Sequence, residues 1–251
     1  MPRMDGDMQS FNIGRGGFAF TGARFEKLDG ASLYTLVTIA VDVTGSVYGF
    51  KKELRNMLVT AIEACKKCGL SENILVRVLF FSDKYANGVL EVHGFIKLSD
   101  VDTSAYPDLE PGGMTPLCDA CYSAIGATTT YAVNELATHD FGANGIAILV
   151  TDGGENASVA TMTMVKKAQE EAITSEQLES FISILIGVNT DDCDTLLETF
   201  RQQAGITHYK PAGEATPQNL AKLAAFVSQS VSSQAQALGT GGPSQSIPAT
   251  I

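Results

Sequence analysis

The sequence is poor in the residues on which nucleic-acid-binding and zinc-binding proteins depend. It has 17 Lys and Arg against 28 Asp and Glu, giving a formal net charge of −11, and three histidines in 251 residues. The shortage of basic residues argues against nucleic acid as a partner, because phosphate binding needs clustered Lys and Arg. The same acidity disfavours an anionic membrane surface. A zinc site built mainly on imidazole is hard to assemble from so few histidines.

Long apolar runs are also missing, and cysteines are few. No stretch approaches the roughly 18 apolar residues of a membrane span, and residues 1–8 hold no apolar segment that could serve as a signal peptide. Five cysteines, an odd number in a chain of this length, do not resemble a secreted disulfide scaffold. We therefore expect a cytoplasmic protein.

The apolar residues that are present form alternating strand and helix patterns. They make up 45% of the chain, and short Val- and Ile-rich runs suit strands that are buried on both faces. The expected strands are 36–41, 74–81, 146–150, 181–188 and 206–210. Helical spacing or capping signals lie at 50–65, 116–138, 159–172, 194–204 and 217–238. This alternation predicts an α/β fold with a doubly wound, mainly parallel sheet and helices on both faces.

Residues 89–98 show a different pattern, in which Glu91, His93 and Lys97 alternate with apolar side chains. They follow the strand at 74–81 closely, through Asn87-Gly88, which is typical of a hairpin turn. We therefore expect this segment to be an antiparallel strand at an edge of the sheet.

The chain divides by composition into a core domain and two terminal segments. The core domain is expected at 32–230. Residues 1–31 form an N-terminal extension with several glycines and phenylalanines, part of which should pack on the domain, because apolar rings are unusual in a solvated tail. Residues 231–251 are mostly Ser, Gln, Gly and Ala, so a flexible C-terminal tail is expected there.

The strongest functional signal is a set of oxygen-bearing side chains in three predicted loops. Asp42, Thr44 and Ser46 follow the first strand of the core domain, Thr115 lies in a Gly-rich loop, and Asp152 follows another strand. Functional residues of an open parallel sheet gather beyond the carboxyl ends of its strands, so these side chains should converge. Oxygen ligands with little protein charge suit Mg²⁺, Mn²⁺ or Ca²⁺. Thr115, followed by a proline, could equally be an ordinary helix cap.

The pattern resembles the metal-ion-dependent adhesion site (MIDAS) of von Willebrand factor A (VWA) domains. That family has Asp-x-Ser-x-Ser in one loop, a Thr in a second loop and an Asp in a third. Asp42, Thr44, Ser46, Thr115 and Asp152 fill these places in order, and Thr44 keeps the hydroxyl where the family usually has Ser. The resemblance implies a Rossmann-like VWA fold in which the hydroxyls contact the metal directly, the aspartates often act through water, and a partner's acidic side chain completes the coordination.

The resemblance implies a protein-interaction domain. We expect no enzyme, because the sequence offers no nucleophile–base pair and no phosphate-binding loop. Mg²⁺ is the expected cation, with Mn²⁺ or Ca²⁺ as alternatives. The absent signal segment and the odd number of cysteines point to the intracellular bacterial or phage members of the family. These work beside AAA-type ATPases or in multi-subunit assemblies, and a phage protein would be associated with the virion.

Two other functions remain open at this point. The chain could be a structural component of a large assembly, with 1–31 and 231–251 as docking elements. It could also be a Mg²⁺-dependent phosphatase similar to the haloacid dehalogenases, which likewise place an Asp after the first strand. That family needs a second Asp two residues on, where Thr44 stands, and a Lys near the third motif, whereas Lys166 and Lys167 lie along a predicted helix.

Two weaker signals favour structural roles. Residues 14–19 superficially fit a dinucleotide-binding fingerprint, but no strand precedes them, so a turn is expected. The pairs Cys65/Cys68 and Cys118/Cys121 have zinc-like spacing, but a helix of about 24 Å would separate the pairs. We expect these cysteines to be small buried side chains.

Overall fold

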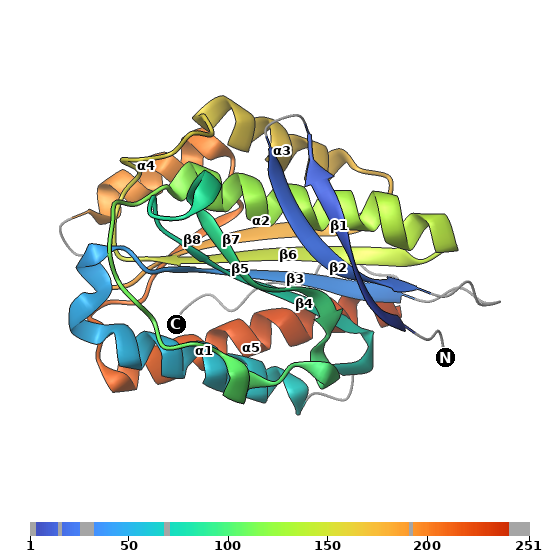
Figure 1. Cartoon of the computed structure of the whole chain (residues 1–251), viewed down its shortest axis with the longest axis horizontal. Coiled ribbons are helices and arrows are strands. Elements are labelled where there is room, and N and C mark those ends of the chain that lie inside the picture. Colours follow the sequence, from blue (N-terminus) through green and yellow to red (C-terminus); the bar gives the residue numbers. More distant parts are fainter. Residues whose placement is uncertain (1–3, 15–16, 26–32, 68–70, 191–192, 241–251) are drawn as a thin grey trace.

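A mixed sheet of eight strands runs through the molecule and carries helices on both faces (Figure 1). The computed structural model describes residues 4–14, 17–25, 33–67, 71–190 and 193–240. The order of strands across the sheet is β1-β2-β5-β4-β3-β6-β7-β8. The strands are β1 (Met4–Ile13), β2 (Phe18–Phe25), β3 (Leu33–Asp42), β4 (Ile74–Phe81), β5 (Val89–Lys97), β6 (Gly142–Thr151), β7 (Leu178–Gly187) and β8 (His208–Pro211).

The central part of the sheet is parallel, as the alternating pattern predicts. β3 pairs in parallel with β4 on one side and with β6 on the other, and β7 and β8 continue the parallel arrangement. β5 is antiparallel to β4, which confirms the direction expected for residues 89–98. It is not the edge strand, however, because β2 and β1 lie beyond it. The predicted α/β fold class, with its antiparallel strands at one side, is thus confirmed.

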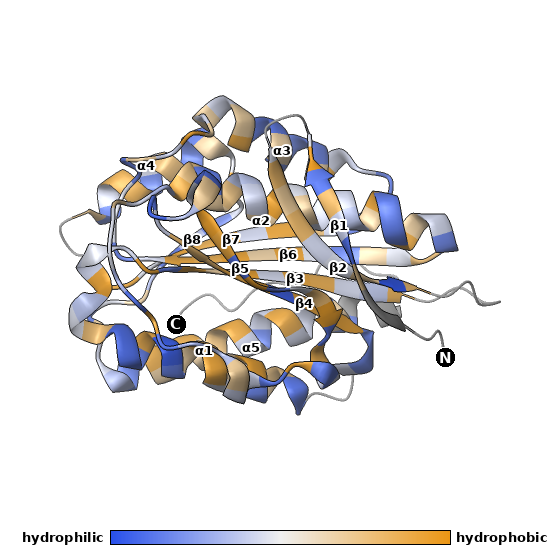
Figure 2. Cartoon of the chain, viewed as in Figure 1, coloured by the Kyte–Doolittle hydropathy of each residue, from blue (hydrophilic) through white to orange (hydrophobic). Residues whose placement is uncertain are grey.

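Helices cover the two faces of the sheet and complete two separate apolar cores. Leu54 of α1 and Leu223 of α5 belong to one core, whereas Ile125 of α2, Val165 of α3 and Leu197 of α4 belong to the other. Figure 2 shows apolar residues along the central strands and polar residues over the outer turns of the helices. The helices are α1 (Lys51–Lys66), α2 (Leu117–Tyr131), α3 (Met162–Thr174), α4 (Asp194–Ala204) and α5 (Pro217–Thr240).

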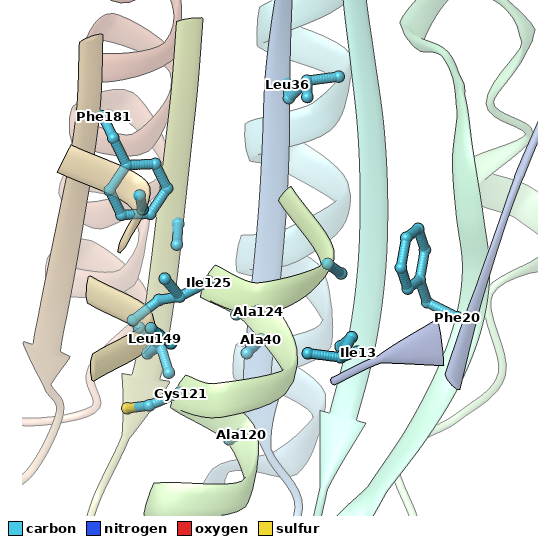
Figure 3. Packing of buried hydrophobic residues seen from close by; sticks show 14 of the residues in the cluster. Ile13, Phe20, Leu36, Ala40, Ala120, Cys121, Ala124, Ile125, Leu149 and Phe181 are labelled. Atoms are coloured by element: carbon cyan, nitrogen blue, oxygen red, sulfur yellow. The ribbon is translucent and has the colours of Figure 1, made fainter. Parts of the chain in front are cut away.

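The hairpin formed by β1 and β2 is part of this architecture. Figure 3 shows Ile13 and Phe20 of the hairpin close to α2, whose Ala124 lies over Ala40 of β3. A side chain on Gly126 of α2 would meet Ile13 at 2.4 Å, so the hairpin approaches the helix very closely. The boundary expected at residue 32 therefore does not mark an edge of the packed core.

Side chains at the C-terminal end of α2 and in the turn after it bind backbone atoms of the hairpin. The hydroxyl of Tyr131 donates to the carbonyl oxygen of Ala23, and the amide of Phe25 donates to the buried carboxylate of Glu135 at 2.7 Å. Glu135 lies in a π-helical turn that continues α2. Contrary to expectation a strand, β1, directly precedes residues 14–19, but the element that follows is the strand β2 and not the helix that a dinucleotide-binding loop needs. Residues 14 and 17, at the ends of the hairpin turn, both have positive φ, which agrees with the expected turn.

The C-terminal helix begins at the expected residue and ends two residues after the expected end at 238. The amide of Asn219 donates to Thr216 Oγ1 at 3.2 Å, so the predicted cap is present. The helix then continues to Thr240, past the boundary expected at residue 231. Gln234 explains the continuation, because its buried side-chain amide donates to Ser180 Oγ at 2.7 Å and its backbone carbonyl accepts from the Asn144 side chain at 3.0 Å. The rest of the expected tail, 241–251, lies outside the described residues.

Candidate metal centre

The predicted site residues lie where β3 and β6 end. Asp42 is the last residue of β3, and Asp152 follows the last residue of β6. The parallel register pairs Val41 with Val150, so Asp42 stands beside Thr151. Thr44 and Ser46 follow β3 at the start of a short 3-10 helix, Gly45–Phe50. This arrangement puts the first and third predicted loops next to each other at the carboxyl edge of the sheet.

Asp42 is completely buried and has a hydrogen-bond donor for each carboxylate oxygen. Oδ1 accepts from the amide of Thr44 at 2.8 Å, and Oδ2 accepts from the hydroxyl of Thr151 at 2.7 Å. Burial raises the pKa of Asp42 to about 6, because the charged form loses its hydration. The charge of Asp152 adds to this rise, whereas the bonds from Thr44 and Thr151 oppose it.

A chain of hydroxyls connects the first loop to Asp152. Thr44 Oγ1 lies 3.0 Å from Ser46 Oγ, and Ser46 Oγ donates to Asp152 Oδ1 at 2.7 Å. Burial raises the pKa of Asp152, and the bond from Ser46 opposes the rise. Four of the predicted residues, Asp42, Thr44, Ser46 and Asp152, are therefore joined in one hydrogen-bonded set.

Thr115 is held against this set by its backbone. Its amide donates to Asn156 Oδ1 at 2.7 Å, and its carbonyl accepts from the amide of Asn156 at 3.0 Å. The loop before it is tied to the first loop, because the amide of Gly45 donates to the carbonyl of Gly113 at 3.1 Å. A β-carbon on Gly153 would lie 3.6 Å from Thr115 Oγ1, so the hydroxyl faces the turn that carries Asp152.

The Gly-rich loop needs glycine at one position in particular. Gly113 has φ +75°, and a β-carbon there would lie 2.1 Å from Asp83 Oδ1. That carboxylate accepts from the amide of Met114 at 2.8 Å and so cannot easily give way. A β-carbon on Gly112 would meet only Lys84, at 4.0 Å. The turn before Thr115 thus depends on Gly113 much more than on Gly112.

Thr115 does not cap α2, although its position before a proline allowed that interpretation. No side-chain cap bond is formed at Pro116, the residue that precedes the helix. The free amides of the first turn are satisfied from another loop instead, since Cys118 donates to Glu155 Oε2 at 2.6 Å and Asp119 donates to Ser158 Oγ at 3.1 Å. The Thr115 hydroxyl is therefore not committed to the helix end.

The sequence did not indicate the residues that hydrogen-bond the site residues and the Gly-rich loop. Thr151 and Asn156 hold Asp42 and Thr115, and Asp83 holds the Gly-rich loop. One signal could have found Asp83, because Ser82-Asp83 is a polar pair directly after the apolar strand at 74–81. Thr151 and Asn156 flank the Asp152 motif closely, but nothing in the sequence assigns their side chains to a particular partner.

The donor set of the site fits a hard divalent cation. Within the described residues, no three His, Cys, Asp or Glu side chains come together as a metal-binding group. The site offers two carboxylates and three hydroxyls instead, and oxygen donors of this kind suit Mg²⁺, Mn²⁺ or Ca²⁺. Two neighbouring carboxylates whose pKa values are both raised are also the groups that a cation would stabilise in their charged forms.

The cysteines of the described residues fit a packing role. Cys65, Cys118 and Cys121 are buried in apolar clusters. Burial raises the pKa of the Cys118 thiol to about 12 and raises that of Cys121 well above its usual value, which favours the neutral thiol. Cys68 lies outside the described residues.

Comparison with known proteins places the fold. No protein-family model matches the chain, and no curated protein matches it. Among solved structures it is similar to the pilus adhesin SpaC from Lactobacillus rhamnosus GG, at 12% identity and TM-score 0.57, over 86% of this chain and 32% of SpaC. It is also similar to the SpRpn10 VWA domain, at 12% identity and TM-score 0.53, over 76% of this chain and 93% of that domain. The chain has a VWA-like fold.

A third similar structure is described as holding a metal. It is proximal thread matrix protein 1 (PTMP1) from the mussel byssus, described as having a zinc-occupied MIDAS motif. The identity is 14% and the TM-score 0.50, over 79% of this chain and 46% of PTMP1. The chain thus spans about a third of SpaC and less than half of PTMP1. Separately, no helix of the described residues combines the length and the apolar character that a bilayer crossing requires.

Proposed function

We propose that this VWA-like chain is a divalent-metal-dependent protein-interaction domain that binds an acidic group of its partner. The observation that carries the proposal is the hydrogen-bonded set of Asp42, Thr44, Ser46 and Asp152, with the Thr115 hydroxyl beside it. The neighbours support it, since they include a pilus adhesin and a protein with an occupied MIDAS motif.

The residues that would hold the cation are the three hydroxyl side chains and the two carboxylates of the site. Thr44, Ser46 and Thr115 would contribute neutral oxygens, and Asp42 and Asp152 would act directly or through water. When bound, the ion supplies concentrated positive charge at the end of the sheet. Mg²⁺ is the proposed ion, with Mn²⁺ or Ca²⁺ as alternatives. The zinc in PTMP1 supports a divalent cation without deciding which one.

An acidic partner group follows from the charges of the proposed ligands. The two carboxylates together balance the charge of a divalent ion, but where they act through water only neutral hydroxyls touch the ion, which then keeps an open position for an incoming anion. The chain itself is strongly acidic, at −11, so the cation would offset the local negative charge at the place where a carboxylate must approach. A carboxylate binding there would gain a charge-assisted contact in a partly desolvated site.

We further propose that the site binds rather than catalyses. The phosphatase alternative needs a second Asp where Thr44 stands, and the Thr44 hydroxyl is engaged with Ser46. Incubation with p-nitrophenyl phosphate and MgCl₂ tests this point, and steady turnover that Asp42→Asn abolishes would favour the enzyme. The cellular setting is also a proposal, namely the cytoplasm or a virion, with an AAA-type ATPase or a multi-subunit assembly as the partner.

A second candidate function is that of a structural component of a large assembly. The specific observation in its favour is the similarity to PTMP1, a thread matrix protein. Under this function the chain would associate through the hairpin or the C-terminal segment, and association would not depend on the metal. Light scattering with and without EDTA separates the two functions, because only the structural component would assemble equally well in both.

Isothermal titration of the protein with MgCl₂ tests the metal site directly. Wild type should bind one equivalent, and Asp152→Ala should bind at least about tenfold more weakly, because it loses a charged ligand. Thr115→Val should keep the fold and impair binding of the partner. A pull-down from lysate with and without EDTA then tests metal dependence. Capture that is unchanged by EDTA, or by Asp42→Ala, would show that the partner uses another surface.

A further inference from the structure

Four large apolar side chains are exposed in the segments that build the candidate metal centre. Single exposed apolar residues are common and need no explanation. These four differ because each comes from a different loop or helix of the same edge of the sheet, and their exposed fractions lie between 54% and 74%. We name them the apolar rim, and its members are Tyr48, Met114, Val159 and Leu196.

Two members of the rim lie beside the hydroxyls of the site. Tyr48 comes two residues after Ser46, and Met114 directly precedes Thr115. Their loops are joined, because the amide of Gly45 donates to the carbonyl of Gly113 at 3.1 Å. The backbone of Met114 is fixed by Asp83 in both directions, at 2.8 Å and 3.1 Å. Its exposed side chain therefore belongs to a well-held loop.

The other two members lie on the side of Asp152. Val159 is in the loop that holds Thr115 through Asn156, and its own amide donates to the buried carboxylate of Asp119 at 3.1 Å. Leu196 lies in the first turn of α4, next to Cys193, whose Sγ is 3.9 Å from the carbonyl oxygen of Asp152. The four members of the rim thus belong to segments that carry the site residues or contact them.

The charges near the rim are suited to an acidic partner. Lys51 Nζ lies 5.2 Å from the centre of the Tyr48 ring. Two acidic side chains of these loops accept from backbone amides, Glu155 from Cys118 at 2.6 Å and Asp83 from Met114 at 2.8 Å. The apolar rim thus has a lysine at its border, in a chain whose net charge is strongly negative.

We propose that the apolar rim is the second part of the binding surface, and that its occupant is an exposed protein segment in which an Asp or Glu is flanked, within two positions, by large apolar side chains. The inference rests on the proposed function, because the carboxylate of this segment would go to the metal. Burial of apolar area against the rim supplies affinity, and exclusion of water strengthens the contact between carboxylate and cation.

Selection from a random heptapeptide library displayed on phage, with the wild-type protein in MgCl₂, tests this proposal. The selected peptides should contain one acidic residue with Leu, Ile, Met or Phe beside it. A synthetic peptide of the most frequent sequence should bind Val159→Ser and Leu196→Ser at least about fivefold more weakly than wild type, because apolar area is lost from each contact. The matched control is Ile173→Ser, which removes another exposed apolar side chain, near the C-terminal end of α3, and should not change binding.

The outcomes separate the rim from the metal site. Calorimetry should give the same Mg²⁺ affinity for the rim variants as for wild type. If EDTA abolishes peptide binding and the rim variants bind as wild type does, the rim proposal is wrong and the proposed function stands. Selection of acidic peptides without apolar neighbours would likewise overturn the rim proposal alone. Selected peptides that lack acidic residues and bind equally in EDTA would overturn both.

Discussion

The hydroxyl of Thr151 donates a 2.7 Å hydrogen bond to Oδ2 of Asp42, and both residues are almost completely buried. The bond joins the ends of β3 and β6 beneath the candidate metal centre. Thr151→Val keeps the shape of the side chain and leaves a buried carboxylate oxygen without this donor. We expect the free energy of unfolding to fall by about 1–3 kcal/mol, the usual cost of an unsatisfied buried group, as measured by urea unfolding.

A suitable control for this change is Thr174→Val at the exposed end of α3, where the hydroxyl donates to the carbonyl of its own helix at 2.8 Å. It should change stability by less than about 0.5 kcal/mol. Equal effects of the two substitutions would mean that the bond to Asp42 contributes nothing specific.

Asp42→Asn should preserve the stability of the metal-free protein and remove the stabilisation by magnesium. The raised pKa, about 6 against 3.8, means that ionised Asp42 costs the metal-free fold about 3 kcal/mol at pH 7.5. Asparagine removes the charge and can still accept from the Thr44 amide. The variant should therefore be at least as stable as wild type in EDTA.

Magnesium should stabilise wild type by about 2.7 kcal/mol at one hundred times its Kd, and it should leave Asp42→Asn nearly unchanged. Thermal unfolding in EDTA and in MgCl₂ measures both effects. A variant that is much less stable than wild type in EDTA would contradict the account of Asp42 as a strained carboxylate.

His93 should make the protein less stable in mild acid. Burial lowers the pKa of His93 below its usual 6.5, and the ring bonds to Tyr106 at 2.8 Å and to the carbonyl of Gly94 at 2.9 Å. The unfolded chain therefore takes up a proton at His93 more readily than the folded one. This contribution to stability is present above about pH 6.5 and is lost as the pH falls through and below that value.

Urea unfolding at pH 7.5 and pH 5.0 measures this effect, and His93→Gln should lose less stability between the two pH values than wild type does. His139→Gln, which leaves His93 in place, is the matched control and should lose as much as wild type. The same loss in all three proteins would refute a role for His93.

Arg77 and Glu91 should be strongly coupled in stability. Arg77 is completely buried in β4, and its Nε donates to Glu91 Oε2 at 2.6 Å. Glu91 also accepts from Thr21 of the hairpin, so the pair ties β2 to the sheet. Glu91→Gln leaves a buried cation without its counter-charge and should cost about 3 kcal/mol. Arg77→Met in the same chain should recover part of that loss.

A double-mutant cycle measures the coupling between the two residues. The exposed pair Lys167 and Glu171 on α3, 3.4 Å apart, serves as the reference and should show a coupling below about 0.5 kcal/mol. Additive effects at Arg77 and Glu91 would contradict the prediction.

The regular part of the fold could be predicted because local patterns and packing agree there. The helix expected at 194–204 is α4 with the same bounds, and the apolar run at 74–81 is β4 with the same bounds. The gathering of Asp42 and Asp152 also followed from one rule, that parallel strands bring their carboxyl ends to one edge.

Some details depend on tertiary contacts that composition does not reveal. The Ser- and Gln-rich end of α5 meets Asn144 and Ser180 through Gln234, and these residues are distant in sequence. Packing of part of 1–31 on the domain was expected, but its two strands and the close contact with α2, where Gly126 admits Ile13, were not. Thr115 was assigned a possible cap because the true cap partners, Glu155 and Ser158, come from another loop.

The adjacent glycines of the second loop should have opposite evolutionary histories. Gly113 has a positive φ, and a β-carbon there would lie 2.1 Å from Asp83 Oδ1, so any substitution would displace both its own loop and the one that carries Asp83. Gly112 faces open space up to Lys84 at 4.0 Å and can drift freely. Among diverging descendants of this chain, the first glycine should vary with the surface chemistry of each lineage, and the second should persist for as long as the loop keeps its shape.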